Sequence, residues 1–115
     1  MALIGFKKRF AEAVSCGSKR QTVRAMRKHP IRQGETLHLY TGLRQPGARL
    51  LARAVCISAE QVYLDLNLAV VDGKKLSFEE RADFGRRDGF TGWAAFIDCL
   101  RELHGLPFEG QVIRW

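Results

Sequence analysis

The spacing of apolar residues changes along this chain of 115 residues, and that change limits the folds open to it. Between residues 35 and 66, apolar side chains alternate with polar ones or form short runs, a pattern typical of β-strands. Strands are predicted there for three segments: Glu35–Thr41, Leu50–Ile57 and Gln61–Leu66. Beyond residue 77 the repeat is helical until a last strand-like segment, Phe108–Trp115. This order of elements predicts an α+β fold.

A short amphipathic helix is predicted near the N-terminus. Phe6, Phe10 and Val14 fall at helical spacing on one side of it. We expect the helix to end near Cys16, because Gly17 suits the left-handed residue that commonly follows a helix.

Two further helices are predicted before the last strand. Ser77 and Glu80 have the spacing of a capping box, which begins the first helix, and Asp88–Phe90 breaks it. Thr91 is expected to cap the second helix. Its apolar stripe consists of Trp93, Phe96, Ile97, Leu100 and Leu103. Asp72–Gly73 is the strongest hairpin signal in the chain.

We therefore expect one domain over residues 1–115. The order of elements favours a small curved sheet or partly closed β-barrel of about five to six strands, with helices packed at its edge. No apolar run approaches the roughly 20 residues of a membrane span, and no secretory signal is recognisable.

The charge is polarised along the chain. Residues 1–53 hold 12 of the 19 Lys and Arg residues and only two acids, Glu12 and Glu35, for a net charge of +10. Residues 54–115 hold seven bases and ten acids, for a net charge of −3. A polarised basic surface is expected of a protein that presents one face to a polyanion, and nucleic acid is the partner we consider first.

The cysteines and histidines predict neither a disulfide framework nor a metal site. Cys16, Cys56 and Cys99 are odd in number and far apart, and the three histidines complete no metal-ligand spacing with them. We expect a cytoplasmic protein with no metal, no cofactor, no membrane partner and no disulfide-linked partner. The sequence leaves the oligomeric state open.

The segment Gly17–Arg24, with the sequence GSKRQTVR, is the most distinctive part of the chain. On an extended strand Thr22 and Arg24 share a face, and Lys19 can join them where the preceding helix turns into the strand. Two cations and a hydroxyl group would form a cradle for a phosphate or a carbonyl oxygen. The same residues also fit a solvated basic edge strand.

This segment resembles the G-x-K-x-x-T-x-R signature of the ASCH family, whose members have a PUA-like β-barrel fold. Gly34–Gly42 is similar to the family's G-[DE]-x-L-x-L-Y strand, and Asp88–Phe90 is similar to its acidic-Gly-Phe corner. The resemblance extends over nearly the whole chain in the same order. It implies a PUA-like barrel and a cleft faced by Lys19, Thr22 and Arg24.

The resemblance implies two kinds of function. The first is the binding of RNA or a nucleotide by residues of the signature and the basic loop after it. The candidate binding residues are Lys19, Arg24, Arg27, Lys28, Arg32 and Tyr40. Loop cations of this kind contact the phosphate backbone, and Tyr40 is a candidate for stacking on a base.

The second implied function is hydrolysis of a modified nucleoside, N(4)-acetylcytidine. By motif position, Thr22 corresponds to the nucleophile, Lys19 to the base and Asp88, in place of the family's glutamate, to the acid. A threonine hydroxyl needs a neighbouring base to act as a nucleophile, which fits this arrangement. A ribonuclease is a third possibility. It ranks last, because the sequence alone does not bring His29, His38 and His104 together.

Overall fold

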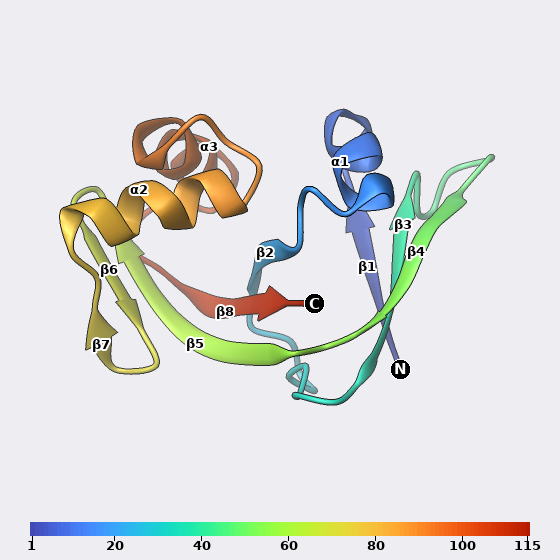
Figure 1. Cartoon of the computed structure of the whole chain (residues 1–115), viewed down its shortest axis with the longest axis horizontal. Helices are drawn as coiled ribbons and strands as arrows, with labels where there is room; N and C mark the ends of the chain where they lie inside the picture. The colour runs from blue at the N-terminus through green and yellow to red at the C-terminus, as the bar shows by residue number, and fades with distance from the viewer.

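The computed structural model describes residues 1–115 and contains eight strands in two sheets with three α-helices (Figure 1). The N-terminal half comprises β1 (Ala2–Phe6), α1 (Ala11–Cys16), β2 (Gln21–Ala25), β3 (Thr36–Thr41) and β4 (Arg49–Val55). The C-terminal half comprises β5 (Ser58–Asp65), β6 (Leu68–Val71), β7 (Lys74–Lys75), α2 (Phe78–Arg87), α3 (Trp93–His104) and β8 (Phe108–Arg114). No helix is long and apolar enough to cross a membrane.

The smaller sheet has three strands in the order β1-β3-β4. β1 is parallel to β3, whereas β3 and β4 are antiparallel with a bulge at Leu39–Tyr40. Side chains alternate across a strand, so Ile4, Leu37 and Leu39 point to one side, where they are fully buried. Together with Trp115 they belong to the first of two hydrophobic cores.

The larger sheet has five antiparallel strands in the order β2-β8-β5-β6-β7. The helices α2 and α3 lie beside one end of this sheet (Figure 1). Phe84 and Phe96 from these helices pack with Val112 of β8 in the second core.

The two sheets are continuous through one long curved path, in which β4 runs into β5 across Cys56 and Ile57 (Figure 1). The prediction of an α+β fold is confirmed. The predicted number of about five to six strands is too low, because eight strands form two sheets, and these do not close into a barrel. The additional strands are β1, at the N-terminus, and the short β7 of the Asp72–Gly73 hairpin.

The first residues form a strand, so the predicted N-terminal helix is wrong in its first turn. Phe6 ends β1, and helix α1 begins only at Ala11 after a 3-10 turn. Ala2, Ile4 and Phe6 alternate toward the core while β1 pairs with β3, and this non-local pairing outweighs the helical spacing. The predicted end is confirmed, because Gly17 follows the helix with a φ of 85°.

Two local signals from Asp72 onward are confirmed, and the predicted cap of α3 is wrong. Ser77 and Glu80 form a complete capping box, and Asp72 and Gly73, with φ of 51° and 78°, make the predicted hairpin turn. Thr91 does not cap α3, whose N-cap is Gly92. The backbones of α2 and α3 meet there, since a Cβ on Gly85 would lie 2.4 Å from the carbonyl oxygen of Gly92.

Candidate functional site

A cleft of about 160 Å³ lies where β1, the start of β2, the turn after α2 and one side of α3 meet. It holds four cationic side chains, from Lys7, Arg9, Lys19 and Arg24. Its aromatic residues are Phe6, Phe10, Phe90 and Phe96. Its buried polar residues are Lys19, Thr22 and Asp88. The side of α3 contributes Cys99, Leu100, Leu103 and His104, and Leu103 is exposed rather than part of the predicted core stripe.

Lys19 is positioned by the corner between α1 and β2. Gly17 ends the helix in the left-handed conformation, and the Lys19 backbone then bonds back to the carbonyl of Ala13 at 2.9 Å. The side chain turns inward and is only 2% exposed. Its Nζ donates to the carbonyl oxygens of Gln21, at 2.7 Å, and Asp88. The same ammonium lies 3.6 Å from the Oδ2 atom of Asp88.

Asp88 follows α2 as its C-cap residue, and its carboxylate faces the signature segment, Gly17–Arg24. Its Oδ1 atom accepts a hydrogen bond of 3.1 Å from the side-chain amide of Gln21, which also donates to the carbonyl of Phe84. Arg87 pairs with Asp83 at 2.8 Å, which leaves the Asp88 carboxylate to Lys19 and Gln21. Gln21, 1% exposed, is therefore part of the site.

Gly89 allows this corner to close. Its φ is +98°, a conformation that costs a residue with a Cβ about 1–2 kcal/mol. A Cβ there would also lie 3.0 Å from the Phe10 ring and 3.3 Å from the Lys19 side chain. Glycine at position 89 therefore lets the left-handed turn bring the Asp88 backbone against Lys19 without this strain.

Thr22 and Arg24 project from one face of β2, which is an edge strand paired with β8. The Nε atom of Arg24 donates to the Thr22 hydroxyl oxygen at 3.0 Å, and its Nη2 donates to the carbonyl of Gly5 at 2.7 Å. Its guanidinium carbon lies 5.0 Å from the centre of the Phe6 ring. These contacts hold the guanidinium in one orientation while three of its five N–H donors remain without a protein acceptor.

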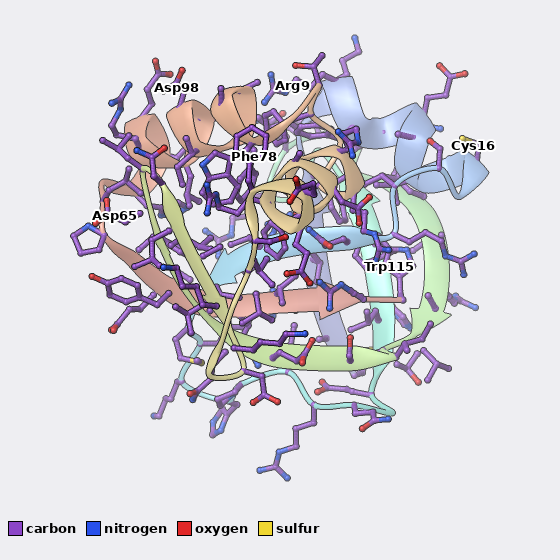
Figure 2. The ribbon with its side chains drawn as sticks, turned by 60° about the vertical axis from the view of Figure 1, so that its left-hand side comes forward. Arg9, Cys16, Asp65, Phe78, Asp98 and Trp115 are labelled. Carbon is purple, nitrogen blue, oxygen red and sulfur yellow. The ribbon has the colours of Figure 1, made fainter.

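Aromatic rings form part of the cleft wall and contact its cations. The Nζ atom of Lys19 lies 4.9 Å from the Phe10 ring centre, and the guanidinium of Arg9 lies 4.5 Å from it and 5.2 Å from that of Phe90. Arg9 also donates to the Sγ atom of Cys99 at 3.5 Å. Figure 2 shows Arg9 between the N-terminal helical segment and the C-terminal helices. Ring faces attract cations, so this wall favours the positive charges in the cleft.

Burial shifts the pKa values of the buried pair in opposite directions. It lowers the pKa of Lys19, and the neighbouring charges of Arg24 and Arg9 lower it further, although Asp88 opposes them. Burial raises the pKa of Asp88, against the opposing effects of Lys19, Gln21 and Arg24. Both shifts favour the neutral forms, so a proton can pass between the two groups at a lower cost than in water.

The predicted site residues fall into two groups. Lys19, Thr22, Arg24 and Asp88 line one cleft, although no hydrogen bond joins Lys19 to Thr22. The other four, Arg27, Lys28, Arg32 and Tyr40, do not line it.

These four residues lie elsewhere on the surface. Arg27 donates to the carbonyl of Leu3 at 2.9 Å, along the free edge of β1. Lys28 and Arg32 are exposed in the loop before β3, and Tyr40 is half-buried within β3.

The sequence did not indicate Gln21 or the aromatic wall as parts of the site. The alternation of β2 was the available signal for Gln21, because it places Gln21 on the same face as the core residue Val23. Phe6 and Phe10 were assigned only to one side of a helix. No group of three His, Cys, Asp or Glu side chains could hold a metal ion, and the three cysteines are free thiols.

In comparisons with known proteins, no family model, no curated protein and no solved structure matches the chain. The fold is a compact α+β domain, and its candidate site is a cleft in which four cationic side chains and one carboxylate lie among apolar and aromatic residues.

Proposed function

We propose that the cleft binds a single nucleobase, presented by RNA or by a free nucleotide, and that the chain is an ASCH-like domain of the PUA-like class. The observation that carries the proposal is the Thr22–Arg24 hydrogen bond of 3.0 Å beside the buried Lys19–Asp88 pair, all within one cleft. The two sheets joined through β4 and β5 support an open relative of the PUA-like barrel.

The size of the cleft supports a base-sized ligand. A closed cavity of roughly 150 Å³ accommodates one benzene ring, and this cleft measures about 160 Å³. One six-membered ring therefore fits inside, while the sugar and phosphate remain outside. Phe10 and Phe90 provide ring faces and edges against which a base can pack.

The polar groups of the cleft match the edge of a pyrimidine. The unused N–H donors of Arg24 and the hydroxyl hydrogen of Thr22, which no protein group accepts, can donate to a ring carbonyl oxygen. Lys7 and Arg9, both exposed at the cleft, can contact the phosphate.

Binding can be tested by calorimetric titration with cytidine 5′-monophosphate. We expect saturable binding at one site per chain, weakened about tenfold or more by Arg24→Met, because a hydrogen bond from a charged group contributes about 1.5–3 kcal/mol. Arg86→Met, on the exposed side of α2, is the matched control and should bind normally. Equal affinities for the two variants would refute the proposal.

A second candidate function is hydrolysis of an acylated cytidine, and the buried pair of Lys19 and Asp88 favours it. Asp88 can accept a proton from the Lys19 ammonium, since burial raises the pKa of the acid and lowers that of the base. Neutral Lys19 then takes the proton of Thr22 as the Thr22 oxygen bonds to the acyl carbon. The bond from that carbon to the exocyclic nitrogen breaks, and the nitrogen takes the proton from Lys19. Water then cleaves the resulting ester, which releases the acid.

The enzymatic candidate can be tested by chromatography of N(4)-acetylcytidine incubated with the protein. We expect cytidine and acetate from the native chain, and none above background from Thr22→Val or Lys19→Met. Thr91→Val, an exposed threonine outside the cleft, is the control and should retain full activity. Binding of the nucleoside without acetate release would leave the cleft as a binding site alone.

A further inference from the structure

The three-stranded sheet has one face that points away from the core. Because Ile4, Leu37 and Leu39 are buried on one side, the intervening residues project from the other, which we call the outer face. Two rows of directly paired residues cross it: Leu3–His38–Arg53 and Gly5–Tyr40–Leu50. Leu3 and Leu50 are 46% and 37% exposed, so no element covers this surface completely.

The outer face has the charge of a surface for a polyanion. None of its three strands contains an aspartate or glutamate. The nearest acid along the chain, Glu35, lies 3.4 Å from the N-terminal amine and is thereby neutralised. Arg53 is exposed and forms no ion pair, and Arg27 lies along the adjoining edge of β1. A phosphate near Arg53 would therefore meet a free cation and no opposing carboxylate.

The outer face is continuous with the cleft. Gly5 lines the cleft and is the direct partner of Tyr40 in the sheet, where neighbouring strands are about 4.8 Å apart. The Leu43 side chain lies over Gly5, within 3.1 Å of where its Cβ would be, and provides an apolar surface between the two regions. A chain that leaves the cleft over Gly5 reaches Tyr40 first and Arg53 next.

We propose that single-stranded RNA with one base in the cleft continues across the outer face, where Tyr40 stacks on an adjacent base and Arg53 contacts a phosphate. The proposal rests on the proposed nucleobase site and extends it from one nucleotide to a polymer. Aromatic and cationic side chains on an open sheet are a general means of binding single strands. The half-buried His38 and the exposed Thr36 on the same face provide polar groups for 2′-hydroxyls, which favours RNA over DNA.

A second copy of the chain fits this face less well. In a two-fold contact, each face meets an identical one. Arg53 would then face a second copy of the same basic surface, with no acid on any of the three strands to neutralise it. An anionic strand meets the same surface without that repulsion.

The test compares a mononucleotide with an octanucleotide. Cytidine 5′-monophosphate reports on the cleft alone, whereas fluorescence anisotropy with labelled octacytidylate RNA reports on the cleft and the outer face together. We expect the octanucleotide to bind more tightly than the mononucleotide. Tyr40→Leu should weaken octanucleotide binding about tenfold, the effect expected for one lost stacking contact, and should leave mononucleotide binding unchanged.

Matched controls lie on the larger sheet and on α2. Tyr63→Leu removes a half-buried tyrosine from β5 and should leave octanucleotide binding unchanged. Arg53→Ala should reduce the slope of log affinity against log salt concentration by about 0.7, the value for one phosphate contact on a single strand. Arg86→Ala, an exposed arginine of α2, should not change the slope.

The possible outcomes separate the two proposals. If the mononucleotide binds but the octanucleotide binds no more tightly, or if Tyr40→Leu and Tyr63→Leu act equally, the outer-face proposal is overturned and the cleft proposal stands. Equal affinity for octadeoxycytidylate overturns the assignment to RNA. Val55 is an exposed residue of the same face, paired with Thr36. A dimer in solution that Val55→Glu dissociates assigns the face to a second copy and also overturns the outer-face proposal. Absence of mononucleotide binding overturns both proposals.

Discussion

The ammonium of Lys19 lies 3.6 Å from the Oδ2 atom of Asp88, and the two side chains are only 3% and 9% exposed. The pair joins the corner before β2 to the end of α2, which are 69 residues apart in the chain. Removing two charges from water is costly, and a buried ion pair is therefore weak evidence for a purely stabilising role. Its position in the cleft, beside Thr22 and Arg24, supports the proposal that it serves a ligand.

The energetic coupling of this pair can be measured with a double-mutant cycle. Lys19→Met leaves the Asp88 carboxylate without its cation, and we expect it to lower the free energy of unfolding by about 3–5 kcal/mol. Lys19→Met combined with Asp88→Asn should cost less than the sum of the single changes, because no buried charge remains unpaired. Chemical denaturation monitored by circular dichroism measures all four proteins. Strictly additive effects would contradict the close contact between the two side chains.

Gly89→Ala should damage both stability and the cleft. The alanine must adopt a φ of +98° and place its Cβ 3.0 Å from Phe10, so we expect a loss of about 1–3 kcal/mol together with weaker nucleotide binding. Gly73→Ala is the matched control, since Gly73 has a φ of +78° and nothing within 4 Å of its Cβ position. Gly73→Ala should lose only the stability that the strained backbone conformation costs, and it should bind the nucleotide normally. Unimpaired binding by Gly89→Ala would contradict the proposed role of this corner.

The capping box of α2 should make stability depend on pH in the acid range. Hydrogen bonds from Ser77 lower the pKa of Glu80 below its ordinary value of 4.5. The unfolded chain therefore binds more protons than the folded one as the pH falls through that region. The contribution of Glu80 to the free energy of unfolding is present above pH 4.5 and is lost as the pH falls below that value. Glu80→Gln keeps an acceptor for the Ser77 N–H but does not titrate.

Thermal unfolding of the native chain and Glu80→Gln at several pH values measures this effect. The native chain should be the more stable protein at pH 7, and the difference in Tm should shrink in acid. Glu79→Gln removes a neighbouring carboxylate that makes no capping hydrogen bond, so its difference in Tm should change less. A pH-independent difference for Glu80→Gln would show that the charged form does not strengthen the cap.

Local signals in the sequence predicted the turns and helix ends well. Gly17, the Asp72–Gly73 turn and the Ser77–Glu80 box each act within a few residues, so the local sequence alone indicates them. Strand β1 was missed because its alternation is short and its stability comes from pairing with β3, more than 30 residues away. The N-cap of α3 was predicted at Thr91 but lies at Gly92. The close approach of α2 and α3 at Gly92 is a tertiary constraint, which local sequence does not indicate.

The candidate site was predictable only in part for the same reason. The signature segment indicated Thr22 and Arg24 from simple strand alternation, and the structure places both in the cleft. The resemblance suggested Asp88, but only the fold shows that its carboxylate faces Lys19 and is held by Gln21. Tyr40 was predicted to belong to the same site, yet the alternation of side chains along β3 places it on the outer face and outside the cleft.

A ¹H–¹⁵N NMR titration with cytidine shows whether this cleft holds a nucleobase. We expect saturable shifts concentrated at the Gly5, Gly89, Phe90 and Cys99 amides and at the Arg24 Nε–H group, all at the cleft or beside it. The amides of Gly73 and Lys75, in the β6–β7 hairpin, should not move. Absence of saturable shifts, or shifts centred away from Thr22 and Arg24, would contradict the account.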